Sequence, residues 1–307
     1  IADDSLYILG GRNTFGYFLG DYAGHKNYDR DVLVYNTGSK ASSIYQIKDY
    51  YKKITSQKCC SVFHCNESLG EKNSVKKAEQ ELKKRYESLE NKYDKFLAEN
   101  YDYKANTYET NKINLLSNPT SLYTKQPTVY YGLMYLAKNA KKEVKIHTPY
   151  IICNDYMYNE LKNIKVPTTI MTNSAENNGN IFGAVDYLNH KKDIINTGVT
   201  IKEYEGGISY HGKSMTIDDD IAIVGSFNMD MRSAYIDTEL MLVINSKYIN
   251  KQLKARMEEY EKKAATVKNE TEYSHIPEGM KMKELSDKKK NIKAWFGWAM
   301  NGLRFLF

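Results

Sequence analysis

An ungapped internal repeat constrains the fold of this 307-residue chain more than any other feature. The segment "DDSLYILGGRN" at residues 3–13 matches "DDDIAIVGSFN" at residues 218–228. The identical pairs are Asp3 and Asp218, Asp4 and Asp219, Ile8 and Ile223, Gly10 and Gly225, and Asn13 and Asn228. Downstream, "DRDVLVYN" corresponds to "DTELMLVIN", which places Asp31 opposite Glu239. Because both matches occur in the same order, they predict a duplicated fold with pseudo-twofold symmetry.

Short apolar segments alternate with helical patterns along the later part of the chain. Strands are predicted within both repeated segments and at 143–151, 168–173 and 199–205. Helical patterns lie between the last three, at 154–164 and 184–198, and the second ends at Gly198, a residue suited to cap a helix. The alternation predicts an α/β fold with a mixed, largely parallel sheet flanked by helices.

Two other segments have helical patterns outside this alternation. Residues 71–99 carry an apolar stripe among lysines and glutamates, which predicts an amphipathic helix packed on the domain. The C-terminal "KKKNIKAWFGWAMNGLRFLF" places lysines before aromatic residues. That pattern suits either the headgroup region of a membrane or a helix docked in the core. No apolar run has the length that a bilayer span requires.

Composition and charge set broad limits on the function. The formal net charge of +6 favours phosphate-bearing partners but does not choose between lipids and nucleic acids. Three cysteines, Cys59, Cys60 and Cys65, lie close to His64, yet their spacing is not that of a zinc site. We therefore predict no metal centre there.

The pair formed by His211 and Lys213 has a clear chemical use. On a strand the two side chains project from one face, and Gly212 between them leaves room for a ligand. The imidazole can attack phosphorus or protonate a leaving oxygen, while the ammonium neutralises charge on the non-bridging oxygens. Such a histidine needs a carboxylate to fix its tautomer, and we expect Glu239 to supply it.

The sequence around this pair is longer and more specific than the pair itself. After Lys213 come four residues, Asp218, six residues, Gly225-Ser226, and then Asn228, "DMRS" and Glu239. This phrase resembles the HKD motif of the phospholipase D superfamily. The segments "HTPYI", "MTNSAENN" and "GSFNMDMRSAYIDTE" resemble its bacterial cardiolipin synthase branch, and "GGRN" with "DRDVLV" resembles the end of the family's first motif. Asp237 stands where that branch usually has Asn, a change that we expect to be tolerated.

The resemblance implies two similar phospholipase D-like α/β halves whose motifs meet in one site. One histidine is transiently phosphatidylated and the other exchanges protons with the alcohols, without a metal or cofactor. Carried over to this chain, the catalytic residues are His211, Lys213, Glu239 and Asp31. His211 is expected to be the acid/base partner, oriented by Glu239, while Asp31 orients the other histidine. Phosphate binding is expected of Asn228, Asn13 and Ser226, and a structural role in the motif of Asp218, Asp3, Gly225, Gly10 and Gly11.

Counting along the repeat places the partners of His211 and Lys213 just upstream of residue 1. We therefore expect the sequence to be a fragment, with the first His-x-Lys on a preceding segment that completes the site. The expected organisation is the C-terminal part of a first half at 1–58, a helical insert or linker at 59–125, a complete second half at 126–250, and C-terminal helices with a possible membrane-interface segment at 251–307.

Three functions remain open from the sequence. The first is a phosphatidyltransferase of cardiolipin synthase type, acting on anionic phospholipid at the surface of a bacterial cytoplasmic membrane. The second is a nuclease or another phosphodiesterase, because a fold does not fix a substrate. The third is a non-catalytic lipid-binding homologue. The branch-specific segments favour the first and make nucleic acid the less expected partner.

Overall fold

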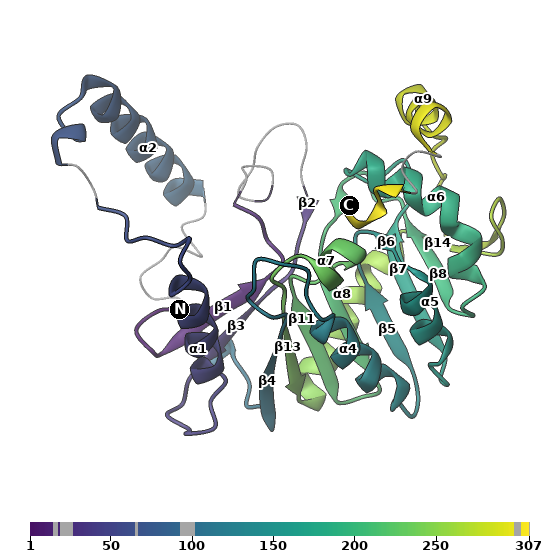
Figure 1. Cartoon of the computed structure of the whole chain (residues 1–307), viewed down its shortest axis with the longest axis horizontal. Helices are drawn as coiled ribbons and strands as arrows, with labels where there is room; N and C mark the ends of the chain where they lie inside the picture. Colours follow the sequence, from purple (N-terminus) through teal and green to yellow (C-terminus); the bar gives the residue numbers. More distant parts are fainter. Residues whose placement is uncertain (15–17, 19–26, 65–66, 93–101, 298–301, 307) are drawn as a thin grey trace. The chain divides into compact units, whose positions relative to one another are not determined.

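The computed structural model describes residues 1–14, 18, 27–64, 67–92, 102–297 and 302–306. The chain divides into two compact units (Figure 1). The larger unit comprises residues 1–47 and 108–307, and the smaller one comprises residues 48–107. Both copies of the repeat lie in the larger unit, so the predicted site can be followed within one body.

The larger unit is built on a nine-stranded sheet (Figure 1). In spatial order its strands are β15 (Tyr273–His275), β14 (Ala264–Val267), β8 (Thr200–Tyr204), β7 (Thr168–Asn173), β5 (Val144–His147), β10 (Lys213–Ile217), β11 (Ile221–Gly225), β13 (Leu240–Asn245) and β4 (Lys112–Ser117). Residues 251–307, expected to be helical, thus also contribute two strands.

The predicted α/β class is confirmed, and the sheet is mixed. Within the described nine-stranded sheet, parallel pairing is confined to β5, β7 and β8. These strands are joined by crossovers through α5 (Asp155–Lys162) and α6 (Ile181–Ile195), which return the chain in the same direction. The other neighbours run antiparallel, among them β10 and β11, which a tight hairpin joins. The sheet is therefore less parallel than the sequence predicted.

Both faces of the sheet are covered. On one face α4 (Thr128–Lys138), α5 and α6 contribute to the main core, where Met134, Met157 and Ile170 are fully buried. The other face carries α8 (Lys247–Glu261) and the hairpin of β1 (Leu6–Gly10) with β3 (Asp31–Tyr35). Burial of each large aliphatic side chain stabilises the fold by about 1.5–3 kcal/mol.

The two copies of the repeat lie against each other. Tyr7 and Leu9 of β1 belong to the same core cluster as Ala222 and Val224 of β11. The first aspartates of the two copies also share an uncommon backbone conformation, with φ of 46° at Asp3 and 51° at Asp218. Asp adopts this left-handed region more readily than most residues. The sequence repeat is therefore a structural repeat in the strands and in their turns.

Two short pairings connect distant parts of the larger unit. β2 (Asn27–Tyr28) runs parallel to β9 (Ser209–Tyr210), and β12 (Met229–Asp230) runs parallel to β6 (Ile151–Ile152). The remaining elements near them are α7 (Met231–Tyr235), α9 (Asp287–Phe296) and the 3₁₀ turn η5 (Arg304–Leu306). In the described part of the chain, no helix combines the length and the apolar character that crossing a membrane requires.

The smaller unit is mainly helical. α1 (Ile44–Thr55) enters it from the larger unit, and it contains α2 (Asn73–Lys92) and the turns η2 (Glu67–Leu69) and η3 (Lys104–Asn106). The helix predicted at 71–99 is present as α2, and residues 93–99 lie outside the described part. No residue of α2 is buried, and Leu82 and Tyr86 are 64% and 57% exposed. Its apolar stripe is thus on the surface, in a helix dominated by lysine and glutamate.

Candidate active site

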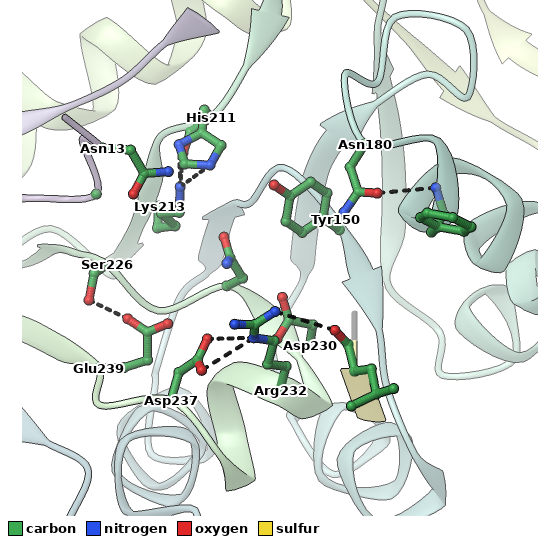
Figure 2. Close-up of a pocket in the computed structure, with 14 residues that line it drawn as sticks. Asn13, Tyr150, Asn180, His211, Lys213, Ser226, Asp230, Arg232, Asp237 and Glu239 are labelled. Atoms are coloured by element: carbon green, nitrogen blue, oxygen red, sulfur yellow. Dashed lines mark hydrogen bonds and ion pairs between the residues drawn. The ribbon is translucent and has the colours of Figure 1, made fainter. Parts of the chain in front are cut away.

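A polar cavity of about 430 Å³ lies where the two copies of the repeat meet, and Figure 2 shows its lining. The first copy contributes Gly11 and Asn13. The second copy and its neighbours contribute Tyr150, Asn180, Phe182, His211, Lys213, Ser226, Asn228, Asp230, Arg232, Asp237, Glu239 and Leu306. The structure therefore brings Asn13, His211, Lys213, Ser226, Asn228 and Glu239, all predicted from the sequence, to one cavity.

Glycines at equivalent places in the repeat allow this approach. Gly10 and Gly225 end β1 and β11. A Cβ atom on Gly10 would collide with the side chain of Asp31, and one on Gly225 would collide with the carbonyl of Leu240. At Gly11 a Cβ atom would lie 2.6 Å from Cδ of Lys213. The missing side chain at Gly11 leaves the space through which the lysine reaches the cavity.

Asp218 has a structural position. Its carboxylate accepts hydrogen bonds from the backbone N–H groups of Lys141, Lys142 and Glu143 at 2.7–3.2 Å. These bonds lower the pKa of Asp218 although partial burial acts in the opposite direction. Asp218 is not among the described residues that line the cavity. It ties the β10–β11 turn to the segment that leads into β5.

His211 and Lys213 lie together at the wall of the cavity (Figure 2). Nδ1 of His211 is 2.7 Å from Oδ2 of Asp29, whose side chain is fully buried. Nζ of Lys213 lies 2.6 Å from Nδ1 and 3.0 Å from Nε2, and it also contacts the carbonyl of His211. An Nδ1–H donated to Asp29 leaves Nε2 as the acceptor for the lysine. That tautomer directs the lone pair of Nε2 to the ammonium of Lys213.

Burial controls the charge of this pair. Desolvation lowers the pKa of His211, while the hydrogen bond to Asp29 opposes that change. Desolvation also lowers the pKa of Lys213 to about 8, against the attraction of Asp29 and Glu239. A bound phosphate would supply the compensating negative charge that the buried ammonium lacks.

The carboxylate that contacts His211 differs from the one expected. The sequence indicated Glu239, but Glu239 accepts a short hydrogen bond from the hydroxyl of Ser226 and one of 2.9 Å from Ser233. Burial raises the pKa of Glu239 and the two hydroxyls oppose the rise. The place beside the imidazole is taken by Asp29, which precedes β3 in the first copy.

Asp31, expected to orient a second histidine, pairs with Arg12. Oδ2 of Asp31 lies 2.7 Å from Nε of Arg12, and Nη1 of the same arginine donates to the carbonyl of Phe18 at 2.6 Å. Asp31 is also opposite Gly10 in the pairing of β1 with β3. Its carboxylate is thus held at the end of the first-copy hairpin.

The two repeated asparagines both reach the cavity. Asn13 and Asn228 line it from opposite copies. Oδ1 of Asn228 is buried and has no hydrogen-bond partner among the described residues. Because a buried amide oxygen without a partner costs about 1–3 kcal/mol, this side chain is arranged for a ligand.

Several cavity residues carried no signal in the motif. Tyr150 and Asn180 line the cavity from the loops after β5 and β7, and Arg232 and Asp230 come from the start of α7. Burial raises the pKa of Asp230 to about 7, although the backbone N–H of Ser233 donates to it. The quoted phrase "DMRS" contained two of these residues, but nothing in their spacing indicated their direction.

His147, to which the sequence gave no role, lies behind the site. Its Nε2 is 3.2 Å from Glu261 and its Nδ1 is 3.3 Å from the hydroxyl of Tyr210. Complete burial lowers the pKa of His147 to about 4. The neutral ring therefore supports Tyr210, the residue that directly precedes His211.

In the described part of the chain, no three His, Cys, Asp or Glu side chains are placed to hold a metal ion. Cys65 lies outside that part.

Comparisons with known proteins bear on the fold and on the family. A phosphatidylserine synthase structure from Haemophilus influenzae superimposes with a TM-score of 0.61, over 99% of this chain and 69% of that one, at 14% sequence identity. At this identity the likeness shows a shared fold, and the family and sequence matches support membership of the phospholipase D superfamily. Within it, residues 133–260 match the family described as cardiolipin synthase, PLD-like domain.

The sequence relatives are distant or partial. Cardiolipin synthase 1 of Staphylococcus epidermidis is 30% identical over 159 residues, which are 51% of this chain and 32% of that protein. An uncharacterized protein of Helicobacter pylori is 24% identical over 290 residues, which are 85% of this chain and 56% of that protein. The matches thus cover between about a third and somewhat more than half of these curated relatives.

Proposed function

We propose that this chain forms the larger part of a phosphatidyltransferase active site of cardiolipin synthase type. The observation that carries the proposal is the arrangement of Asp29, His211 and Lys213 at a polar cavity shared by the two copies of the repeat. The match of residues 133–260 to the cardiolipin synthase domain supports a phospholipid as the substrate. The proposed place of action is the membrane surface.

The proposed reaction has two displacements at one phosphorus atom. A nucleophilic histidine, expected on an upstream segment, forms a P–N bond as the P–O bond to the leaving alcohol breaks. Protonated His211 gives its Nε2 proton to the leaving oxygen and becomes neutral. It then accepts the proton of the incoming alcohol, whose oxygen forms the new P–O bond as the P–N bond breaks. Protons and electron pairs balance, and no other co-reactant is needed.

The surrounding groups suit these steps. Asp29 stabilises the positive imidazole ring when His211 is protonated, because its carboxylate accepts from Nδ1. Lys213, whose side chain is almost fully buried, neutralises charge on the non-bridging oxygens. Asn13 and Asn228 provide amide groups on either side of the phosphate. The unpartnered Oδ1 of Asn228 can accept a hydroxyl hydrogen of the alcohol.

The test is a lipid mass spectrum of phosphatidylglycerol vesicles incubated with the complete native polypeptide. We expect cardiolipin and free glycerol from the unmodified protein and neither from His211→Ala. The matched control is His275→Ala, which removes an exposed histidine of β15 and should leave turnover unchanged. Turnover retained by His211→Ala, or no lipid product from the folded unmodified protein, would reject the proposal. Cleavage of a nucleic acid in a parallel assay would then identify the second function considered above.

A further inference from the structure

Two cations of the C-terminal segment attach its described residues to α6 and to the loop before it. Lys289 is 7% exposed, and its Nζ donates to the carbonyls of Ala175, Glu176 and Asn178 at 2.6–3.0 Å. Desolvation lowers the pKa of Lys289. The buried lysine thus fixes α9 to the loop that leads into α6, where Figure 1 shows the two helices as neighbours.

A second cation fixes the end of the same segment. Arg304 donates from Nε and Nη2 to the two carboxylate oxygens of Asp186, at 2.7 and 3.1 Å, and from Nη2 to the carbonyl of Cys153 at 2.9 Å. Asp186 is 1% exposed. Asn189, three residues further along α6, donates to the carbonyl of Gly297 at 3.2 Å. Because positions i and i+3 share a helix face, α9 and η5 are attached to one face of α6.

Four large apolar side chains of this segment lie on the surface. Trp295 is 76% exposed, and Leu303, Phe305 and Leu306 are 45–49% exposed. A terminal helix docked in the core would bury such residues and expose its lysines. Here the lysine at position 289 is buried and the tryptophan is exposed, which reverses that pattern. Neither exposed aromatic rings nor docked lysines alone would be unusual, but together they indicate that an apolar partner is missing.

The exposed face also carries positive charge. Lys288, Lys290 and Lys293 of α9 are exposed, and Lys288 lies seven residues before Trp295, on the same helical stripe. Nζ of Lys290 lies 3.7 Å from Oδ1 of Asp287, while in the described part of the chain neither Lys288 nor Lys293 forms an ion pair. We call Lys288, Lys290, Lys293, Trp295, Leu303, Phe305 and Leu306 the C-terminal patch. Aromatic and aliphatic side chains beside lysines match the headgroup boundary of an anionic bilayer.

The C-terminal patch continues into the cavity. Leu306 lines the cavity, and its carbonyl accepts from Nη1 of Arg232 at 3.4 Å. Phe182, at the start of α6, lines the same cavity and is 44% exposed. Its neighbour Asn180 belongs to the loop that Lys289 fixes. A surface resting on the patch would therefore reach the edge of the proposed active site.

We propose that the C-terminal patch docks this protein on an anionic lipid leaflet and presents the cavity to the phosphodiester groups of the lipids. The proposal rests on the proposed function for its substrate but makes a separate claim about binding. The apolar side chains enter the boundary between headgroups and acyl chains, and the lysines pair with lipid phosphates. Each lysine close to an anionic surface increases binding by about five-fold.

The first test is flotation with vesicles of phosphatidylglycerol and phosphatidylcholine, compared with vesicles of phosphatidylcholine alone. Trp295→Ala/Phe305→Ala should lower binding at least about ten-fold, since both rings leave the interface. Lys288→Gln/Lys290→Gln/Lys293→Gln should lower binding to the anionic vesicles by about a hundred-fold, a factor of about five for each lysine, and remove the preference for them. Circular dichroism melting checks that each variant is folded.

Matched controls remove equal numbers of rings and charges elsewhere. Tyr131→Ala/Tyr135→Ala removes two aromatic rings of α4, each 57% exposed. Lys76→Gln/Lys77→Gln/Lys83→Gln removes three exposed lysines of α2. Both controls should bind as the unmodified protein does. Losses equal to those of the patch variants would show a general surface effect and overturn the proposal.

A direct measurement uses tryptophan fluorescence. In the Trp298→Phe background Trp295 is the remaining tryptophan of the chain, since the sequence contains two. Brominated phosphatidylglycerol should quench it on binding. If vesicles bind without quenching Trp295, the proposal is overturned. It is also overturned if sedimentation shows that the patch variants disrupt a dimer while vesicle binding is unchanged.

Activity separates this proposal from the proposed function. On the complete polypeptide, Trp295→Ala/Phe305→Ala should lose turnover of vesicle lipid but keep turnover of monomeric, short-chain phosphatidylglycerol. Absence of turnover with either substrate in the unmodified protein would reject the proposed function, while flotation would still decide on the patch. Equal loss on both substrates would overturn a docking role.

Discussion

The substitution Asp29→Asn tests which carboxylate supports His211. Oδ2 of Asp29 is 2.7 Å from Nδ1, and the aspartate side chain is fully buried, so the hydrogen bond is shielded from water. A hydrogen bond to a charged partner of this kind contributes about 1.5–3 kcal/mol, and most of it is lost when the acceptor becomes a neutral amide. A loss of about 2 kcal/mol at the protonated imidazole corresponds to a rate about thirty-fold lower.

The assay combines turnover with the titration of His211. We expect Asp29→Asn to lower the rate and to move the pKa of His211 further down, because the hydrogen bond to Asp29 now opposes the effect of burial. Histidine NMR spectra, assigned by comparison with His211→Ala, follow the titration. The matched variant is Glu239→Gln, whose side chain contacts Ser226 and Ser233 rather than the ring.

The comparison of these two variants shows whether Asp29 or Glu239 orients His211. If Glu239→Gln lowers the pKa of His211 and Asp29→Asn leaves it unchanged, then Glu239 is the orienting acid and the contact with Asp29 has no part in catalysis. A lower rate in Asp29→Asn with an unchanged titration would show a structural effect alone. A melting curve close to that of the unmodified protein confirms that the variant is folded.

Two further predictions concern pH. The pKa of Lys213 is lowered to about 8, so binding of inorganic phosphate should weaken as pH rises through about 8. Phosphate binding is measured as an increase in melting temperature. The Lys213→Met variant should bind phosphate weakly at every pH. Burial raises the pKa of Asp230 to about 7. Between the ordinary carboxyl pKa and pH 7, the folded state therefore binds more protons than the unfolded state. The free energy of unfolding falls as pH rises through this window. Asp230→Asn, which keeps an acceptor for the N–H of Ser233, should therefore raise the free energy of unfolding by about 1–2 kcal/mol above pH 7 and by much less near pH 4. Denaturation at the two pH values checks this, and equal effects at both would contradict the assigned cause.

Patterns of local spacing predicted the parts of the fold that depend on one segment. The apolar pieces of the repeat predicted strands in both copies, which are present as β1 and β3 and as β11 and β13, because strand patterns act within a few residues. The resemblance to the phospholipase D superfamily implied a structural role for Asp218, which has a left-handed backbone conformation and accepts from three backbone N–H groups. The alternation of side chains along an extended segment predicted the proximity of His211 and Lys213, although of the two only Lys213 lies in a strand, β10.

Contacts between segments that are distant in the sequence could not be predicted from local patterns. The C-terminal sequence permitted either a core helix or an interfacial one, and hydrophobicity alone did not separate them. The decisive contacts join Lys289 and Arg304 to backbone carbonyls and to Asp186, more than a hundred residues away. Such partners have no periodic signal. The sequence therefore identified the composition of the segment but not which of its side chains would be buried.

The same limit explains why Asp29 was missed, and the structure supplies the physical reason. β2 runs parallel to β9 with Tyr28 opposite Tyr210. Extending this register by one residue places Asp29 beside His211, and the backbone N–H of His211 donates to the carbonyl of Tyr28 at 2.6 Å. The pairing contains two residues on each strand, which is too short for any alternation of apolar and polar residues to reveal.

Charge rather than hydrophobicity fixes the register of that short pairing. Asp29, Arg30 and Asp31 have three different partners: the first contacts His211, the second donates to the hydroxyls of Tyr210 and Ser214, and the third pairs with Arg12. In a strand a slip of one residue turns every side chain to the opposite face. It would bring Arg30 to the ring of His211 and the ammonium of Lys213, where like charges repel in a buried site. The alternation of acid, base and acid therefore selects the one alignment in which the first copy supplies a carboxylate to the histidine of the second.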